Sequence, residues 1–235
     1  MPVSEKMKGL LDQALSAIQQ DAQHQLPPDT LKTIYQAFDD LGAETAKQAH
    51  NVLAVVMAKF ALPYVEAAMR AHPDRFQEEI DNPDVSSPIT WLASMEKIVR
   101  GELKSDDEAF MESAYIAGNS EESFPLKLKA ETALSVLYYA MQVIDQGWPV
   151  VRRGINIRTK QEIVLRHDAD TTTAEMYAFV HDEVTEAMPD DEQRRTDPAR
   201  YLTFWTWWLS EAVPYAWNYA EQRSTEPIAI TFPAA

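Results

Sequence analysis

Cysteine is absent from the 235-residue chain, and glycine is scarce, with six residues. Without cysteine there are no disulfides, no thiolate nucleophile and no Cys-ligated zinc or iron–sulfur site. The glycines lie too far apart to form the phosphate-binding loops of the Walker and dinucleotide fingerprints. The G-x-S-x-G and H-E-x-x-H motifs do not occur either. These absences predict a protein that is not an enzyme and that uses no cofactor and no metal.

The composition is typical of a globular protein, with 46% apolar and 25% charged residues. The formal net charge is −16. Such a chain repels nucleic-acid phosphates and anionic lipids, so we expect neither nucleic acid nor a membrane among its partners. The charge favours a protein partner with a basic surface. The first twenty residues become polar before the apolar region of a signal peptide develops, so we expect a cytoplasmic location.

Helical periodicity and helix-stop signals recur along most of the chain. Ser87 and the proline after it are typical of a helix start, and Gly101 of a helix end. An alanine-rich stretch over about 43–71 predicts a long helix, which Pro63 should kink or divide. We therefore predict a mainly α fold for residues 1–235: a single-domain bundle of about eight helices.

Residues 148–166 follow a different pattern. Apolar and polar side chains alternate over 155–157 and again over 163–165, which is the spacing of β-strands. This predicts a small β-hairpin insertion in the helical domain. The tail over 228–232, IAITF, predicts one further short strand.

Four of the six tryptophans fall within residues 201–220, YLTFWTWWLSEAVPYAWNYA. On a helix capped by Asp197 and begun by Pro198, most of the aromatic side chains share one broad face. The polar stripe on the other side argues against a membrane span, so we expect a core helix. Trp207 and Trp217 project among the polar side chains. They either pack under a neighbouring loop or stand exposed as anchors for a partner.

His167 and Asp168 form a His-Asp pair, which is similar to the metal-binding pair of HD-type phosphohydrolases. The other metal ligands cannot be assigned by spacing, and a second pair, His181 and Asp182, makes the dipeptide less specific. Asp168 and Asp170 would also suit capping of the helix that follows. A metal-dependent phosphohydrolase is therefore the enzymatic alternative.

Acidic residues open one of the predicted helices. Ser105 is placed to cap a helix whose first turn contains three carboxylates, which complement the positive end of the helix dipole. Carboxylates left on the surface would also attract a basic partner and help to exclude wrong ones. The predicted partner-binding residues are Asp106, Asp107, Glu108, Trp207 and Trp217.

A recognisable helix pattern occurs in three stretches: ALPYVEAAMRAHPDR, PITWLASMEKIVRGELKSDDEAFMESA and LKAETALSVLYYAM. A helix ends in Leu-Pro, a Pro-Asp loop follows, a Trp-bearing helix closes on Arg-Gly-Glu, and an alanine-rich helix comes last. Over about 57–145 this outline resembles a family of helical immunity proteins from bacterial polymorphic-toxin systems. The matching residues are Pro63, Pro73, Asp74, Trp91, Arg100, Gly101 and Glu102.

That resemblance implies an intracellular protein that binds and neutralises a cognate toxin and catalyses nothing. The hairpin and the Trp-rich helix have no counterpart in the family pattern. The leading hypothesis is a non-catalytic binding protein, most simply an immunity or antitoxin-like inhibitor. The alternative binding function is a helical adaptor or chaperone for a secreted effector, which would use the acidic surface to hold an extended or unfolded segment.

Overall fold

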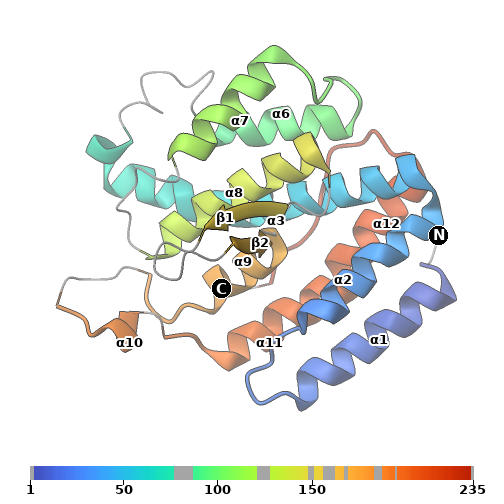
Figure 1. The fold of residues 1–235 in the computed structure, drawn as a ribbon, viewed down its shortest axis with the longest axis horizontal. Coiled ribbons are helices and arrows are strands. Elements are labelled where there is room, and N and C mark those ends of the chain that lie inside the picture. Colours follow the sequence, from blue (N-terminus) through green and yellow to red (C-terminus); the bar gives the residue numbers. More distant parts are fainter. Residues whose placement is uncertain are drawn as a thin grey trace.

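Helix α3 (Ala43–Ala71) forms the axis of the fold. In the computed structural model it packs against α8 (Leu128–Gln146), α12 (Val213–Glu221), α6 (Pro88–Val99) and α9 (Ala169–Ala178), which surround it (Figure 1). The predicted mainly α fold is confirmed. The other elements are α1 (Glu5–Gln20), α2 (Pro28–Ala37), the 3-10 turns η1 (Phe38–Leu41) and η2 (Pro73–Arg75), α7 (Glu108–Ser120), α10 (Asp190–Gln193), α11 (Pro198–Trp207) and the π-helical turn η3 (Trp208–Ala212). The structure describes residues 3–76, 87–120, 128–147, 151–155, 162–166, 169–182, 187–193 and 195–233.

The sequence of α3 reflects its central place. Every residue from Ala49 to Ala58 is buried, so this part of the helix is covered on all sides. Within the described part of the chain, α3 alone is long and apolar enough to cross a membrane by length and composition, with a mean hydropathy of 1.6. Of that window, 56% is buried among the other helices, and this packing accounts for the apolar composition. Pro63 lies on the exposed side, and the helix continues through it undivided.

The aromatic segment forms one continuous helical rod from α11 through η3 to α12. Asp197 caps it, as predicted, by accepting a hydrogen bond from the Ala199 N–H at 2.9 Å. Pro214 near the start of α12 has no N–H, and its ring crowds the preceding turn of an α-helix. The wider π turn just before it accommodates this proline: the Val213 N–H reaches back five residues to the carbonyl of Trp208.

Two short strands lie in the segment for which a hairpin was predicted. β1 (Val151–Ile155) pairs antiparallel with β2 (Glu162–Arg166), with Val151 opposite Arg166 and Ile155 opposite Glu162. Residues 148–150 and 156–161 lie outside the described residues. The hairpin insertion as a whole therefore stays a prediction.

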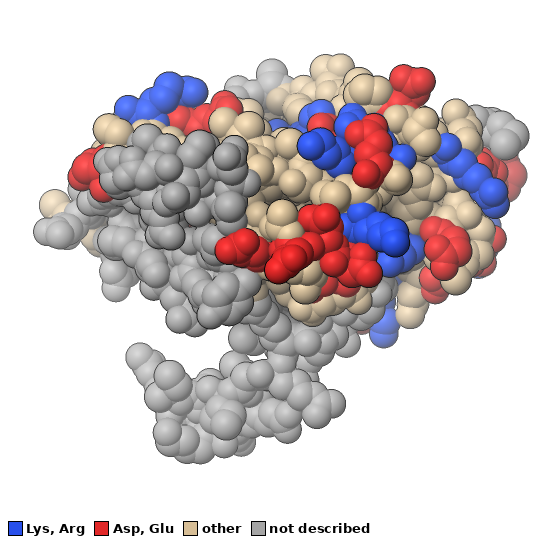
Figure 2. Space-filling model, turned by 90° about the horizontal axis from the view of Figure 1, so that it is seen from above, with Lys and Arg blue, Asp and Glu red and all other residues tan. Residues whose placement is uncertain are grey.

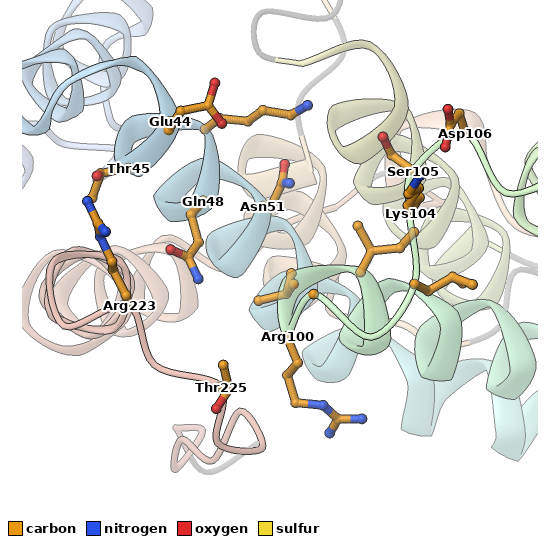
Figure 3. Close-up of a pocket in the computed structure, with 15 residues that line it drawn as sticks. Glu44, Thr45, Gln48, Asn51, Arg100, Lys104, Ser105, Asp106, Arg223 and Thr225 are labelled. Carbon is orange, nitrogen blue, oxygen red and sulfur yellow. The ribbon is translucent and has the colours of Figure 1, made fainter.

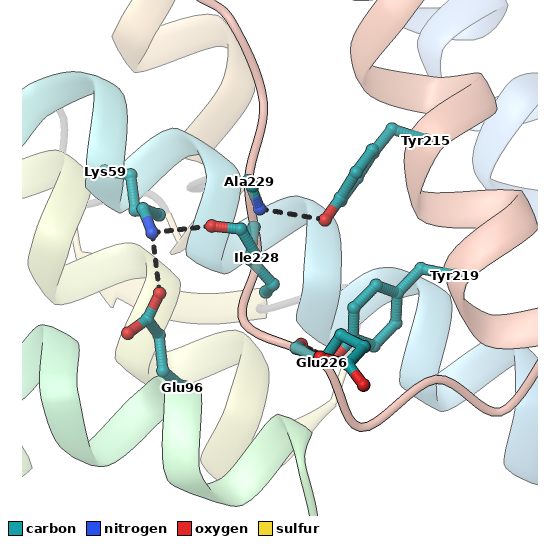
Figure 4. A network of polar contacts seen from close by, with 7 residues as sticks. All are labelled: Lys59, Glu96, Tyr215, Tyr219, Glu226, Ile228 and Ala229. Atoms are coloured by element: carbon teal, nitrogen blue, oxygen red, sulfur yellow. Dashed lines mark hydrogen bonds and ion pairs between the residues drawn. The ribbon is translucent and has the colours of Figure 1, made fainter.

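The C-terminal segment after α12 runs back across α3 and α6 (Figure 4). Lys59 Nζ donates to the carbonyl of Ile228 and pairs with Glu96, both at 2.7 Å. The Ala229 N–H donates to the Tyr215 hydroxyl at 3.0 Å. The strand predicted for this tail is wrong: these described residues form none, because side chains of the helices take up the backbone groups that a neighbouring strand would pair with.

Asp170 is a buried carboxylate in the first turn of α9, with only 1% of its surface exposed. Its Oδ1 accepts the indole N–H of Trp208 at 2.6 Å, and its Oδ2 accepts the hydroxyl of Tyr35. Asp170 thus links α2, α9 and the aromatic rod, and Asp168, the other residue expected to cap this helix, lies outside the described residues. Burying a carboxylate is favourable only when hydrogen bonds replace its hydration, and these two donors do so.

Replacing Asp170 with alanine should lower the free energy of unfolding by about 3 kcal/mol, because Trp208 and Tyr35 each lose a buried acceptor. Urea unfolding followed by circular dichroism measures the change. The control is Asp12→Ala on the exposed side of α1, which should change stability by less than about 0.5 kcal/mol. Equal stability of the two variants would contradict a structural role for Asp170.

His50 is buried on α3, and burial lowers its pKa below the ordinary value of 6.5. Its Nε2 lies 3.3 Å from the carbonyl of Tyr35. Because the unfolded chain binds a proton that the folded protein disfavours, stability should fall as the pH drops below about 6.5, by at most about 1.4 kcal/mol per pH unit. In a series of urea titrations from neutral to mildly acidic pH, His50→Gln should show a flatter profile than the wild type. Parallel profiles would show that His50 does not cause the acid loss.

Candidate functional site

The three carboxylates that the sequence singled out lie at the start of α7: Asp106 and Asp107 in the turn after α6, and Glu108 as the first residue of the helix. Asp106 and Glu108 are exposed, and Asp107 is half-buried. Asp107 Oδ1 accepts the N–H groups of Ala109 at 3.1 Å and Phe110 at 3.3 Å, so Asp107, and not the predicted Ser105, caps α7. Asp107 is better placed than Ser105 because it lies directly before the first helical residue, where its side chain reaches the free N–H groups. Of the three carboxylates among the predicted contact residues, Asp106 and Glu108 are therefore exposed to a partner.

Helix α7 extends this acidic turn with a further carboxylate and an apolar residue. Glu112 is exposed, and Met111 has 40% of its surface exposed, one of only a few large apolar side chains in the described residues that are so open. Asp106, Glu108 and Glu112 form no ion pair with any described residue. We refer to Asp106, Glu108, Met111 and Glu112 as the α7 patch. Viewed from above, the acidic side chains of the molecule gather in clusters, with lysines and arginines beside them (Figure 2).

The structure places Trp207 and Trp217 in the core: of the two alternatives, packing holds for both, and their assignment as exposed partner contacts is wrong. Trp207 is 7% exposed and Trp217 is 3% exposed. The indole N–H of Trp207 donates to the carbonyl of Thr231 at 2.9 Å, and its ring packs 5.6 Å from that of Phe232. The C-terminal segment thus covers the side of the rod that the helical pattern marks as polar. Trp217 packs against Phe38, with ring centroids 5.8 Å apart.

A second candidate site is a pocket of about 660 Å³, which the sequence did not reveal (Figure 3). Its walls come from the first turns of α3, the end of α6 with the turn that follows, and the residues after α12. Asp106 stands on its rim and so borders both the pocket and the α7 patch. Three segments far apart in the sequence form this pocket, and no local pattern brings them together. Its volume is in the range of sites for small molecules.

Metal-binding groups do not gather in the described residues: no cluster of three His, Asp or Glu side chains is present there. His181 lies 3.5 Å from Glu192, and His50 faces a backbone carbonyl. His167 and Asp168, the predicted metal pair, lie outside the described residues, so the HD-type alternative stays a prediction.

Comparison with models of known protein families finds none that matches the chain. Comparison with curated proteins finds no significant match in sequence. The two candidate sites are therefore interpreted from their own geometry and charge.

Truncating Trp207 tests its burial. Trp207→Ala should lower the free energy of unfolding by about 3–5 kcal/mol, because a large aromatic side chain leaves the core. Trp207→Phe is the matched variant: it keeps an aromatic ring against Phe60 and Phe232 and loses the bond to Thr231, so its cost should be clearly smaller. Urea unfolding compares the two. A Trp207→Ala protein as stable as the wild type would show that this side chain is not part of the core.

Proposed function

We propose that this chain is a non-catalytic binding protein that docks a basic protein partner on the α7 patch, and that the partner is a toxin which it neutralises. One observation carries the proposal: an exposed methionine, Met111, stands among three carboxylates that are unpaired within the described residues. The likeness to helical immunity proteins over 57–145 supports the choice of partner, since that stretch includes the whole α7 patch.

The carboxylates and the methionine of the α7 patch would contribute to binding in different ways. Unpaired carboxylates on a chain of net charge −16 accelerate the approach of a basic protein and penalise acidic ones. Met111 supplies a flexible, polarizable apolar contact that loses water when the partner docks, and this desolvation stabilises the complex after the charges have met. Charge alone on an exposed surface contributes little to affinity, so the complex needs the apolar contact that Met111 provides.

Charge reversal on α7 tests the proposal against the protein encoded by the neighbouring gene. The double variant Glu108→Lys/Glu112→Lys should weaken binding at least about tenfold, with most of the loss at low salt, because attraction becomes repulsion. Met111→Ser should weaken binding at every salt concentration, because the apolar contact does not depend on ionic strength. Isothermal titration calorimetry of the purified proteins measures both effects.

The matched control is Glu5→Lys/Asp12→Lys on α1. It makes the same change in net charge, from −16 to −12, on exposed residues, and Glu5, like Glu108, lies in the first turn of its helix. If both double variants bind the neighbouring protein as tightly as the wild type does, the α7 patch is not the interface. If the wild type binds unfolded fragments of that protein more tightly than the folded form, the adaptor or chaperone function replaces inhibition.

A further inference from the structure

The pocket beside the α6–α7 turn contains a polar group that the fold leaves unsatisfied. Asn51 on α3 is 7% exposed, lies within a run of buried residues and lines the pocket (Figure 3). Its Oδ1 is buried and has no hydrogen-bond partner in the described part of the chain. Buried amide groups are nearly always paired, because an unpaired one loses its hydrogen bonds to water and gains none within the protein. A ligand in the pocket would supply the missing partner.

The first turn of α3 adds positive potential to the same wall. Glu44 and Thr45 line the pocket, and Gly42, the residue before the helix, offers no side-chain cap. The first N–H groups of a helix have no partner within it, and the helix dipole places partial positive charge there. In a 29-residue helix this end is suited to an anion.

Cations also line the pocket without partners, although the chain as a whole is strongly acidic. Lys47, Lys104 and Arg223 form no ion pair with the described residues, and they outnumber the two rim carboxylates, Glu44 and Asp106. Another lining residue is excluded from this set: the guanidinium of Arg100 points away from the pocket in Figure 3 and is paired with Glu102 at 2.8 Å.

Arg223 occupies a position that usually belongs to glycine. The N–H groups of Arg223 and Ser224 bond to the carbonyls of Ala220 and Tyr219, both at 3.0 Å, which is the Schellman end of a helix. This geometry gives Arg223 a φ of 49°, in the left-handed region that disfavours residues with a Cβ atom. The backbone conformation ends the helix, but no contact explains why arginine and not glycine occupies this position, because the guanidinium makes no hydrogen bond or ion pair in the described residues. A role in holding a ligand would account for it.

We infer that the pocket binds a small phosphate ester that carries hydroxyl groups. The phosphate would lie beside Arg223 and Thr45 near the start of α3, on the side of the pocket where Figure 3 shows both, and Lys104 and Ser105 lie across the pocket from it. A ligand hydroxyl would meet Asn51, because a hydroxyl both donates and accepts and can satisfy either end of an amide. Ile98 and Leu103 provide the apolar wall for the carbon skeleton.

Titration calorimetry with ribose 5-phosphate, inorganic phosphate and ribose tests the site. The sugar phosphate should bind more tightly than either fragment. Arg223→Gly should weaken binding of both phosphate probes about tenfold, the loss expected for one charge-assisted contact. Asn51→Leu should weaken only ribose 5-phosphate. Neither variant should lower the melting temperature, because glycine suits the left-handed position and leucine removes a buried amide oxygen that has no partner in the described residues.

Lys32→Ala is the matched control, since Lys32 is exposed on α2 and its loss changes the net charge as Arg223→Gly does. The control should bind both phosphate probes like the wild type. The inference is overturned if neither phosphate probe gives saturable binding at millimolar concentration. It is equally overturned if Arg223→Gly and Asn51→Leu bind ribose 5-phosphate no more weakly than Lys32→Ala does. None of these residues belongs to the α7 patch, so either result leaves the proposed docking of a protein partner to its own test.

Discussion

The packing of the aromatic rod, α11 to α12, against α3 is the interaction on which the rest of the fold depends. Phe60 on α3 contacts Phe204 and Trp207 of the rod, with ring centroids 5.8 and 5.5 Å away. Since α3 is buried on every side from Ala49 to Ala58, one neighbour cannot cover it, and α8, α6 and α9 have to complete the enclosure. The rod in turn needs the C-terminal segment over Trp207. Burial of α3 thus determines where the other elements lie.

Hydrophobic burial alone does not fix how these helices are rotated against one another, and the buried polar groups restrict that freedom. Asp170 holds Tyr35 and Trp208 together, and therefore α2, α9 and the rod. Lys59 joins α3 to α6 and to the C-terminal segment in the same way. Asp170 is buried and Lys59 is half-buried, so water only partly replaces a hydrogen bond that a shift in packing breaks, and each of these groups favours one arrangement over similar ones.

Local signals in the sequence predicted the helices well, whereas contacts between distant segments escaped them. Asp197 caps the rod as expected, and Gly101 follows α6 with a positive φ of 75°. Caps and stops act on adjacent residues, so a sequence reveals them. Helical spacing alone placed Trp207 among polar side chains and made it a candidate partner contact, because the tail that covers it lies more than twenty residues away. The acidic turn was found, but the pocket was not, because its cations become neighbours only when α3, α6 and α12 meet.

A cationic pocket and an acidic patch can coexist on one small protein because their charges act over different distances. At physiological ionic strength the field of exposed charges decays over about 8 Å, so the net charge of −16 governs how molecules approach more than what they meet at contact. A basic protein is drawn toward the whole surface and toward the α7 patch. An anion is repelled at first, and only contacts inside the pocket can reverse that repulsion. Asn51 and Arg223 would therefore decide the affinity for the proposed ligand, since they offer short-range, directional contacts that repulsion from distant carboxylates does not cancel.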